Sequence, residues 1–140
     1  MSTTEQNKAI VQRFLDAWNH RQPEAFDDLV VPTVVRHCQA TPAVVIQNLN
    51  QLKDFMRQDT AIFPDSVQTL THAAAEGDLV GVWCTYEGTQ RGPIGPLPAS
   101  GQKVKFDFGG MFRMDGGKIA EWWVTWDNIT VLRALGHLKD

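Results

Sequence analysis

The stretch from Lys105 to Gly136 constrains the fold more than any other part of the chain. Two segments with β-strand character, Lys105–Met114 and Lys118–Trp126, are separated only by Asp115-Gly116-Gly117. Glycine and aspartate readily supply the positive φ angles that tight hairpin turns require. We therefore predict a long antiparallel hairpin, and we expect the rest of the chain to pack around it.

The register of this hairpin follows if Asp115 and Gly117 face each other across the turn. The predicted pairs are then Gly110 with Trp122, Gly109 with Trp123, Phe108 with Val124 and Phe106 with Trp126. Because side chains alternate between the faces of a strand, one face gathers mostly apolar and aromatic residues: Phe106, Phe108, Gly110, Trp122, Val124 and Trp126. Such a face, with a notch at the glycine, is typical of one wall of a small-molecule pocket, and also of a packed core.

The composition predicts one globular domain spanning residues 1–140. Hydrophobic residues make up 43% of the chain and charged residues 21%, which suits a core that needs no disulfides or metals. The net charge of −3, with no basic run, argues against nucleic acid as a partner. The N-terminus is polar and no apolar stretch approaches the ~20 residues of a membrane span. We therefore expect a cytoplasmic protein without a signal peptide or membrane association.

The cysteine and aromatic residues further limit the kinds of site that the chain can carry. Cys38 and Cys84 lie far apart and in no metal-binding spacing, which predicts free thiols in a reducing compartment. No His-rich or clustered carboxylate motif predicts a metal site, and we expect no cofactor. Five tryptophans and seven phenylalanines in 140 residues favour either the binding of a flat ligand or a dimer interface.

Three helices are predicted before the long strands, with a short extended segment, Val34–Cys38, between the second helix and the third. The first begins at Thr3 or Thr4, the second is a short helix between Pro23 and Pro32, and the third is capped by Asn48 or Asn50. Apolar residues recur at helical spacing in each of them. The inward-facing residues are Ile10, Val11, Phe14, Leu15 and Trp18 in the first, Phe26, Leu29 and Val30 in the second, and Leu49, Leu52, Phe55 and Met56 in the third.

From Val67 onwards the pattern changes to the alternation of strands. Val67–Ala75 and Leu79–Gly88 form a second predicted hairpin, and the Pro/Gly-rich segment Gly92–Gly101 follows as a connector or a lid. Asp127 or Asn128 caps a last helix that ends at Gly136. Because no strand alternates with a helix, we predict an α+β fold: a curved antiparallel sheet with the N-terminal helices packed on its concave face. A cone-shaped cavity is expected between the two.

Several short motifs occur in a fixed order along the chain. They are Pro32-x-x-Val35-x-His37, Phe63-Pro64-Asp65, Ala75-Glu76-Gly77-Asp78, Gly88-Thr89-x-x-Gly92, Pro98-x-x-Gly101-x-x-Val104, Phe112-Arg113, Gly117-Lys118-Ile119-x-Glu121-x-Trp123, Trp126-Asp127 and Leu132-Arg133-x-Leu135-Gly136. In this order and spacing the chain resembles the SnoaL-like polyketide cyclases, also called ester cyclases, over nearly its whole length. These belong to the nuclear transport factor two-like superfamily, which has a cystatin-like fold.

The resemblance implies an intramolecular aldol-type ring closure without metal or organic cofactor. In such cyclases a carboxylate removes a proton next to a carbonyl group, and the resulting enolate attacks a second carbonyl. The chain departs from the family at the positions that carry this chemistry. The acid/base aspartate aligns with Val124, and the histidine and glutamine of the neighbouring strand align with Gly110 and Phe108. A further histidine of many relatives is Trp122.

The ionisable residues that still match the family are His37 and Asp127, and these are the predicted catalytic residues. Each has a simpler alternative, because Asp127 would cap the last helix and His37 would be a solvated or structural histidine. Arg36 could hold a carboxylate or ester, but strand alternation places Arg36 and His37 on opposite faces. The predicted ligand-binding residues are Phe14, Trp18, Phe108, Gly110, Trp122, Val124 and Trp126.

Three classes of function remain open from the sequence. The first is a cyclase or isomerase that acts on a hydrophobic carbonyl compound by acid/base chemistry, with a SnoaL-like hydroxylase as a variant. The second is a non-catalytic protein that binds a hydrophobic small molecule in the same pocket. The third is an assembly role through the outer face of the sheet, where Trp123 is predicted to contribute to a homodimer contact.

Overall fold

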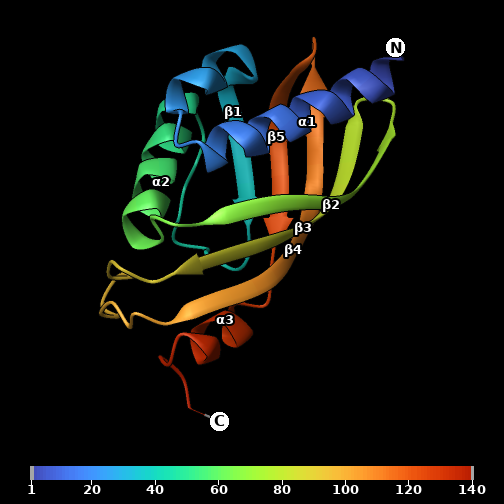
Figure 1. The fold of residues 1–140 in the computed structure, drawn as a ribbon. Helices are drawn as coiled ribbons and strands as arrows, with labels where there is room; N and C mark the ends of the chain where they lie inside the picture. Colours follow the sequence, from blue (N-terminus) through green and yellow to red (C-terminus); the bar gives the residue numbers. More distant parts are fainter. Residues whose placement is uncertain (1, 140) are drawn as a thin grey trace.

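The computed structural model describes residues 2–139, and its centre is one sheet of five strands in the order β1-β5-β4-β3-β2. The strands are β1 (Val30–Cys38), β2 (Val67–Glu76), β3 (Leu79–Thr89), β4 (Lys103–Asp115) and β5 (Lys118–Thr125). The helices are α1 (Thr3–Asn19), the 3-10 helix η1 (Pro23–Asp28), α2 (Leu49–Ile62) and α3 (Asn128–Ala134). Figure 1 shows α1 and α2 over the same side of the bent sheet. The predicted α+β architecture is confirmed.

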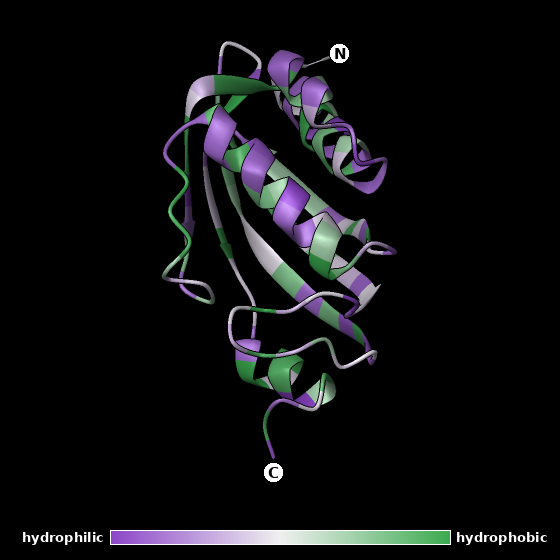
Figure 2. Cartoon of the chain, turned by 90° about the vertical axis from the view of Figure 1, so that its left-hand side faces the viewer, coloured by the Kyte–Doolittle hydropathy of each residue, from purple (hydrophilic) through white to green (hydrophobic). Residues whose placement is uncertain are grey.

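The three α-helices begin where side chains can satisfy their first free N–H groups. Asn48 caps α2, because its side chain accepts a hydrogen bond from the backbone N–H of Gln51 at 2.8 Å. The cap of α1 is Ser2 rather than the predicted Thr3 or Thr4, with its Oγ accepting from the N–H of Glu5 at 3.2 Å. In Figure 2, the side of α2 that faces the viewer is mainly hydrophilic. The opposite side of α2 packs inward, where Leu52 and Met56 are buried.

The first strand differs from the prediction in two ways. The second helix is only the 3-10 helix η1, and Pro32 lies inside β1 instead of ending a helix. Proline is tolerated there because β1 is an edge strand, which leaves one side of its backbone unpaired. Furthermore, β1 pairs with β5 in parallel, whereas the other three strand pairs are antiparallel. The sheet is therefore mixed, not wholly antiparallel.

The hairpin of β4 and β5 forms, but its register is shifted by two residues from the predicted one. Asp115 pairs with Lys118 across a two-residue turn, which shifts the register by one residue from the predicted pairing. A bulge at Ala120 shifts it by one residue more. Gly110 consequently pairs with Val124 and not with Trp122. Because the shift is even, the two faces of the hairpin keep the predicted residues.

The two glycines of β4 serve a different purpose from the one predicted. A Cβ atom at Gly110 would collide with the backbone carbonyl oxygen of Trp123. A Cβ at Gly109 would lie 2.6 Å from the ring of Trp83, which crosses the strand at this point. The glycines thus allow a close approach of the bulged strand and of an indole from β3, rather than making room for Trp122 and Trp123.

The core fills the space between α1, η1 and one end of the sheet. Phe14 is fully buried, and its ring lies 4.8 Å from Phe26 and 5.4 Å from Trp122, measured between ring centroids. Phe112 stacks on Trp122 at 5.1 Å. Within residues 2–139, no helix has the length and apolar character needed to cross a membrane. The other end of the sheet, towards α3, is not filled in this way.

Candidate active site

A cavity of about 310 Å³ lies in this unfilled part, between α2, the concave face of the sheet and α3. Its walls are largely aromatic, and they include Trp18, Phe55, Phe63, Phe106, Phe108, Trp122 and Trp126. This volume is in the range of small-molecule sites, and the apolar lining is typical of them. The predicted cavity between helices and sheet is therefore present.

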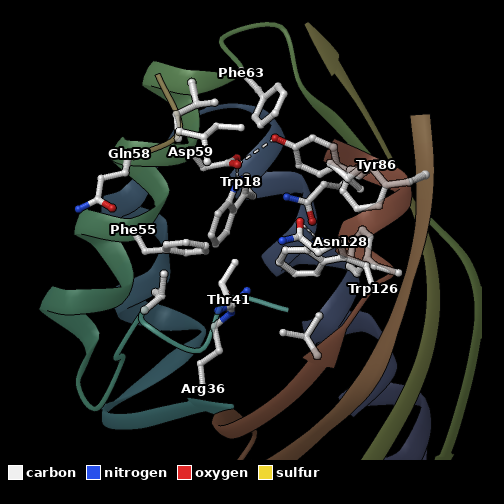
Figure 3. A pocket seen from close by; sticks show the side chains of 18 of the residues that line it. Trp18, Arg36, Thr41, Phe55, Gln58, Asp59, Phe63, Tyr86, Trp126 and Asn128 are labelled. Carbon is white, nitrogen blue, oxygen red and sulfur yellow. Dashed lines mark hydrogen bonds between the residues drawn. The ribbon is translucent and has the colours of Figure 1, made fainter. Parts of the chain in front are cut away.

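One carboxylate lines this cavity among the residues that the structure describes, and it belongs to Asp59 in the last turn of α2. The side chain accepts a hydrogen bond from Nε1 of Trp18 at 3.0 Å and another from the hydroxyl of Tyr86 at 2.9 Å. Figure 3 shows these three side chains converging from α1, α2 and β3. The two donors fix the orientation of the carboxylate in a largely aromatic wall.

Burial sets the acidity of Asp59. Although part of the residue is accessible, desolvation raises the pKa of its carboxyl group, and the bonds from Trp18 and Tyr86 only partly offset this effect. Burial also raises the pKa of Tyr86, as does the nearby carboxylate. The tyrosine is therefore a phenol that donates a hydrogen bond, and Asp59 is a carboxyl group whose pKa is shifted upwards, towards the range of a general base.

A buried cation lines the same cavity. Arg36 of β1 is only 7% exposed, and its guanidinium carbon lies 4.5 Å from the centroid of the Phe55 ring and 5.1 Å from that of Trp122. Burial lowers the pKa of Arg36, but an arginine remains protonated in proteins. In the part of the chain that the structure describes, no carboxylate lies within 4.0 Å of this guanidinium.

Three buried polar atoms lack a hydrogen-bond partner among the described residues, and all three belong to side chains that line this cavity. They are Nε of Arg36, Oγ1 of Thr41 and Nε1 of Trp122. Figure 3 places Arg36 and Thr41 towards one end of the view, and Asp59 and Tyr86 towards the other. The cavity thus has a carboxylate with its own donors, and a separate set of donors without acceptors.

The Gly92–Gly101 segment and α3 line part of the cavity. Ile94, Val131 and Leu132 contribute apolar lining from these two segments. The fully buried amide of Gln90 ties them together: its Nε2 donates to the carbonyl oxygens of Gly92 and Pro98, at 3.0 and 3.2 Å. Its Oε1 lies 2.7 Å from Nε2 of His137, which follows α3. This segment, which the sequence predicts to be a connector or a lid, therefore forms part of the wall.

The seven predicted ligand-binding residues divide into two groups. Phe14 and Gly110 do not reach the cavity, because Phe14 is enclosed by other core rings and Gly110 lies against the backbone of β5. The other five line it: Trp18, Phe108, Trp122, Val124 and Trp126.

The structure does not bring the two predicted catalytic residues to the cavity. His37 is exposed on the outer face of the sheet, where its Nε2 contacts Oε2 of Glu121 at 2.7 Å and its ring stacks on Trp123. Asp127 is the exposed N-cap of α3, and its carboxylate accepts from the backbone N–H and the hydroxyl of Thr130. These bonds hold the pKa of Asp127 below its usual value, so it has the acidity of a capping group rather than that of a base near neutrality.

Sequence reasoning missed Asp59, although a signal for it was present. Leu52, Phe55 and Met56 were assigned to the inward face of α2, and Asp59 follows Phe55 and Met56 at the same helical spacing. A carboxylate on an otherwise apolar helix face is an exception that calls for a function or a partner. Arg36 was considered as a ligand-holding group, and strand alternation does place it on the face opposite to His37.

Comparison with known proteins agrees with this architecture. Among solved structures, TsrD from Streptomyces laurentii superposes with a TM-score of 0.87 at 26% identity, covering 99% of this chain and 100% of that one. IdmH from Streptomyces antibioticus, a candidate polyketide cyclase, gives a TM-score of 0.82 at 26% identity over 94% of this chain and 99% of its own. AclR from Streptomyces galilaeus, a candidate hydroxylase, shares the fold at 22% identity, with a TM-score of 0.83 over 99% and 89% of the two chains.

At the level of sequence, comparison with curated proteins finds no match. The model of the SnoaL-like polyketide cyclase family, in contrast, matches residues 8–135. The fold is the cone-shaped one of the nuclear transport factor two-like superfamily, as the sequence motifs implied. This chain therefore belongs to the SnoaL-like polyketide cyclase family.

Proposed function

We propose that this protein is an enzyme that acts by acid/base chemistry on a hydrophobic, carbonyl-containing small molecule, without metal or organic cofactor. Its proton acceptor in this proposal is Asp59, in place of His37 and Asp127. The observation that carries the proposal is the position of Asp59: within the described residues, it supplies the one carboxylate of an aromatic cavity that has the size of a small-molecule site.

The chemistry follows from the environment of that carboxylate. A base that removes a proton from a carbon next to a carbonyl works best when its pKa is close to the working pH. Desolvation moves the pKa of Asp59 in this direction, while the bonds from Trp18 and Tyr86 hold the group in one orientation. Asp59 takes the proton, and the electron pair of the broken C–H bond stays on the substrate, which becomes an enolate. The enolate then attacks a second carbonyl of the same molecule or accepts a proton at another position.

Hydrogen exchange tests this proposal without knowledge of the natural substrate. 2-Tetralone, a flat bicyclic ketone, would be incubated with the protein in deuterium oxide, and the loss of its α-proton signals would be followed by NMR. We expect the wild-type protein to accelerate exchange, and Asp59→Asn to reduce the acceleration by a factor of about 10²–10⁴, as is typical for the loss of a general base. His37→Ala is the matched control, and it should exchange at the wild-type rate.

Two outcomes would contradict the assignment. If Asp59→Asn exchanged as fast as the wild type, Asp59 would not be the base. If His37→Ala lost activity while Asp59→Asn retained it, the original assignment from sequence would be restored.

A non-catalytic binding role is the second candidate, and the apolar residues Phe108, Trp122 and Val124 favour it. These occupy positions where family members carry polar acid/base groups, and here all three line the cavity. Saturable quenching of tryptophan fluorescence by 2-tetralone, without any hydrogen exchange, would support binding alone. Exchange above the buffer rate that depends on Asp59 would exclude it.

We also propose a homodimer through the outer face of the sheet. Trp83, Met111 and Trp123 are exposed there by 49, 39 and 39%, and exposed apolar side chains clustered on one face favour contact with a second copy. A cytoplasmic location is proposed from the free thiols of Cys38 and Cys84. Recovery of the protein from a membrane or secreted fraction would contradict this location.

A further inference from the structure

The unpaired polar atoms of the cavity point to a specific chemical group on its ligand. Buried polar atoms in native proteins are nearly always hydrogen-bonded, and one that is not calls for an explanation. In this protein Nε of Arg36, Nε1 of Trp122 and Oγ1 of Thr41 are buried without a partner among the described residues. All three side chains line one cavity, so a single ligand could satisfy them together.

The charge of Arg36 strengthens this point. A buried guanidinium without a counter-ion is costly, because taking a charge out of water costs several kcal/mol that only a partner can offset. The rings of Phe55, Trp122 and Trp126 lie 4.5, 5.1 and 6.0 Å from its guanidinium carbon. Contacts with aromatic faces attract the cation but accept none of its N–H bonds. The rings therefore hold the guanidinium in place, and its Nε lacks an acceptor among the described residues.

The donor types define what is missing. Arginine and the indole nitrogen can only donate hydrogen bonds, and a threonine hydroxyl can donate as well. An oxyanion such as a carboxylate or an enolate accepts several such bonds, and its planar shape fits the fork of a guanidinium. The flanking rings favour a flat, apolar molecule as the bearer of this group.

Asp59 does not fill this role. Its two oxygens are bonded to Trp18 and Tyr86, and it lies beyond ion-pair distance of Arg36. The cavity therefore offers a ligand two distinct places: a carboxylate that can take a proton, and a set of donors that can hold a negative oxygen.

We propose that Arg36, Thr41 and Trp122 form an oxyanion-binding site, and that the ligand of this protein is a planar, apolar molecule bearing a carboxylate or an enolate oxygen. This names the substrate class for the function proposed above and rests on the same cavity. It goes further, because it assigns recognition to three residues that take no part in the transfer of the proton to Asp59.

Matched pairs of probes test the site by isothermal titration calorimetry. For the carboxylate, 2-naphthoate is compared with methyl 2-naphthoate; for the enolate, the anion of 1,3-indandione is compared with neutral 1-indanone. We expect the wild-type protein to bind at least one anion about 10-fold or more tightly than its neutral match. The pair that shows the preference distinguishes a carboxylate ligand from an enolate ligand. Equal affinities within both pairs would overturn the proposal, since water alone would then occupy the donors.

Variants locate the preference. Arg36→Met should remove it by weakening anion binding about 10- to 100-fold, with less than about a 3-fold change for the neutral probes. Arg113→Met is the matched control, because Arg113 bonds to Glu121 outside the cavity, and it should bind like the wild type. Preference retained in Arg36→Met would overturn the assignment.

Further variants keep the test valid if Arg36→Met misfolds, and they distinguish the oxyanion site from the proposed enzyme activity. If Arg36→Met does not fold, Thr41→Val and Arg36→Lys carry the test, and each should weaken anion binding but not neutral binding. Unchanged anion affinity in both would overturn the site. Asp59→Asn should keep the preference for the anion while losing hydrogen exchange. If the wild type prefers anions but does not accelerate hydrogen exchange, the oxyanion site stands and the proposed enzyme is refuted. If it accelerates exchange but shows no preference for anions, the enzyme stands and the oxyanion site is refuted.

Discussion

The pH dependence of stability gives a test of Asp59 that needs no ligand. Burial raises the pKa of this carboxyl group in the folded state above the value of about 3.9 expected for an unfolded chain. As pH rises past 3.9, the unfolded state releases this proton while the folded state keeps it. Folding then becomes less favourable with rising pH, until Asp59 ionises in the folded state as well. The contribution of Asp59 is thus fully present in acid and is lost as pH rises through its folded pKa.

The magnitude follows from the number of protons involved. One carboxyl group accounts for at most one proton, so the free energy of unfolding changes by no more than about 1.4 kcal/mol per pH unit between the two pKa values. Asp59→Asn removes this dependence. The charged or polar groups around Asp59 are Trp18, Tyr86, Arg21 and Arg36, and none of them is a second carboxyl group or a histidine, the side chains that ordinarily titrate in this range.

Urea unfolding of the wild type and of Asp59→Asn at half-unit steps from pH 4 to pH 8 measures the effect. The difference in unfolding free energy, wild type minus variant, should fall with rising pH and then become constant. Contributions of other carboxyl groups cancel in this difference. Asp127→Asn is a control of opposite sign, because hydrogen bonds lower the pKa of Asp127, and its difference should grow with pH over the acidic range. A constant or rising difference for Asp59→Asn would refute the raised pKa.

Two further predictions concern the sheet. Gly110→Ala should lower the free energy of unfolding, measured in urea, by about 1–3 kcal/mol or more, because a Cβ there meets the carbonyl oxygen of Trp123. Gly81→Ala is the control, because its Cβ would have only an ordinary contact at 3.8 Å. Equal losses of stability in the two variants would contradict the packing argument. Trp123→Ser should shift the mass in analytical ultracentrifugation from dimer to monomer, and a wild-type protein that is already a monomer would refute the proposed outer-face contact.

Much of the fold could be predicted from the chain because its signals are local. The strands Val67–Ala75 and Leu79–Gly88 were predicted to within one residue of the observed ends of β2 and β3. The observed caps Asn48 and Asp127 were each one of two predicted residues, since capping depends on a few neighbouring residues. Features that depend on contacts between distant parts of the chain were harder to predict. The parallel pairing of β1 with β5 and the bulge at Ala120 leave no clear pattern in the sequence.

The candidate site shows the same division. The aromatic wall was largely predicted, because alternation along β4 and β5 decides which residues share a face. The polar groups were not predicted, because the family resemblance places the acid/base groups on those strands, at positions that are apolar here. Asp59 lies on a helix for which only apolar core residues were predicted. For β1, alternation separated Arg36 from His37, but which of the two faces inward depends on how β1 joins the sheet.

A crystal structure of the protein with 2-tetralone would test the central claim most directly. We predict that the ketone lies in the cavity with its oxygen within hydrogen-bond distance of Arg36 or Trp122 and an α-carbon facing the carboxylate of Asp59. A cavity filled by the protein's own side chains, or a ketone bound on the outer face near His37, would contradict the account.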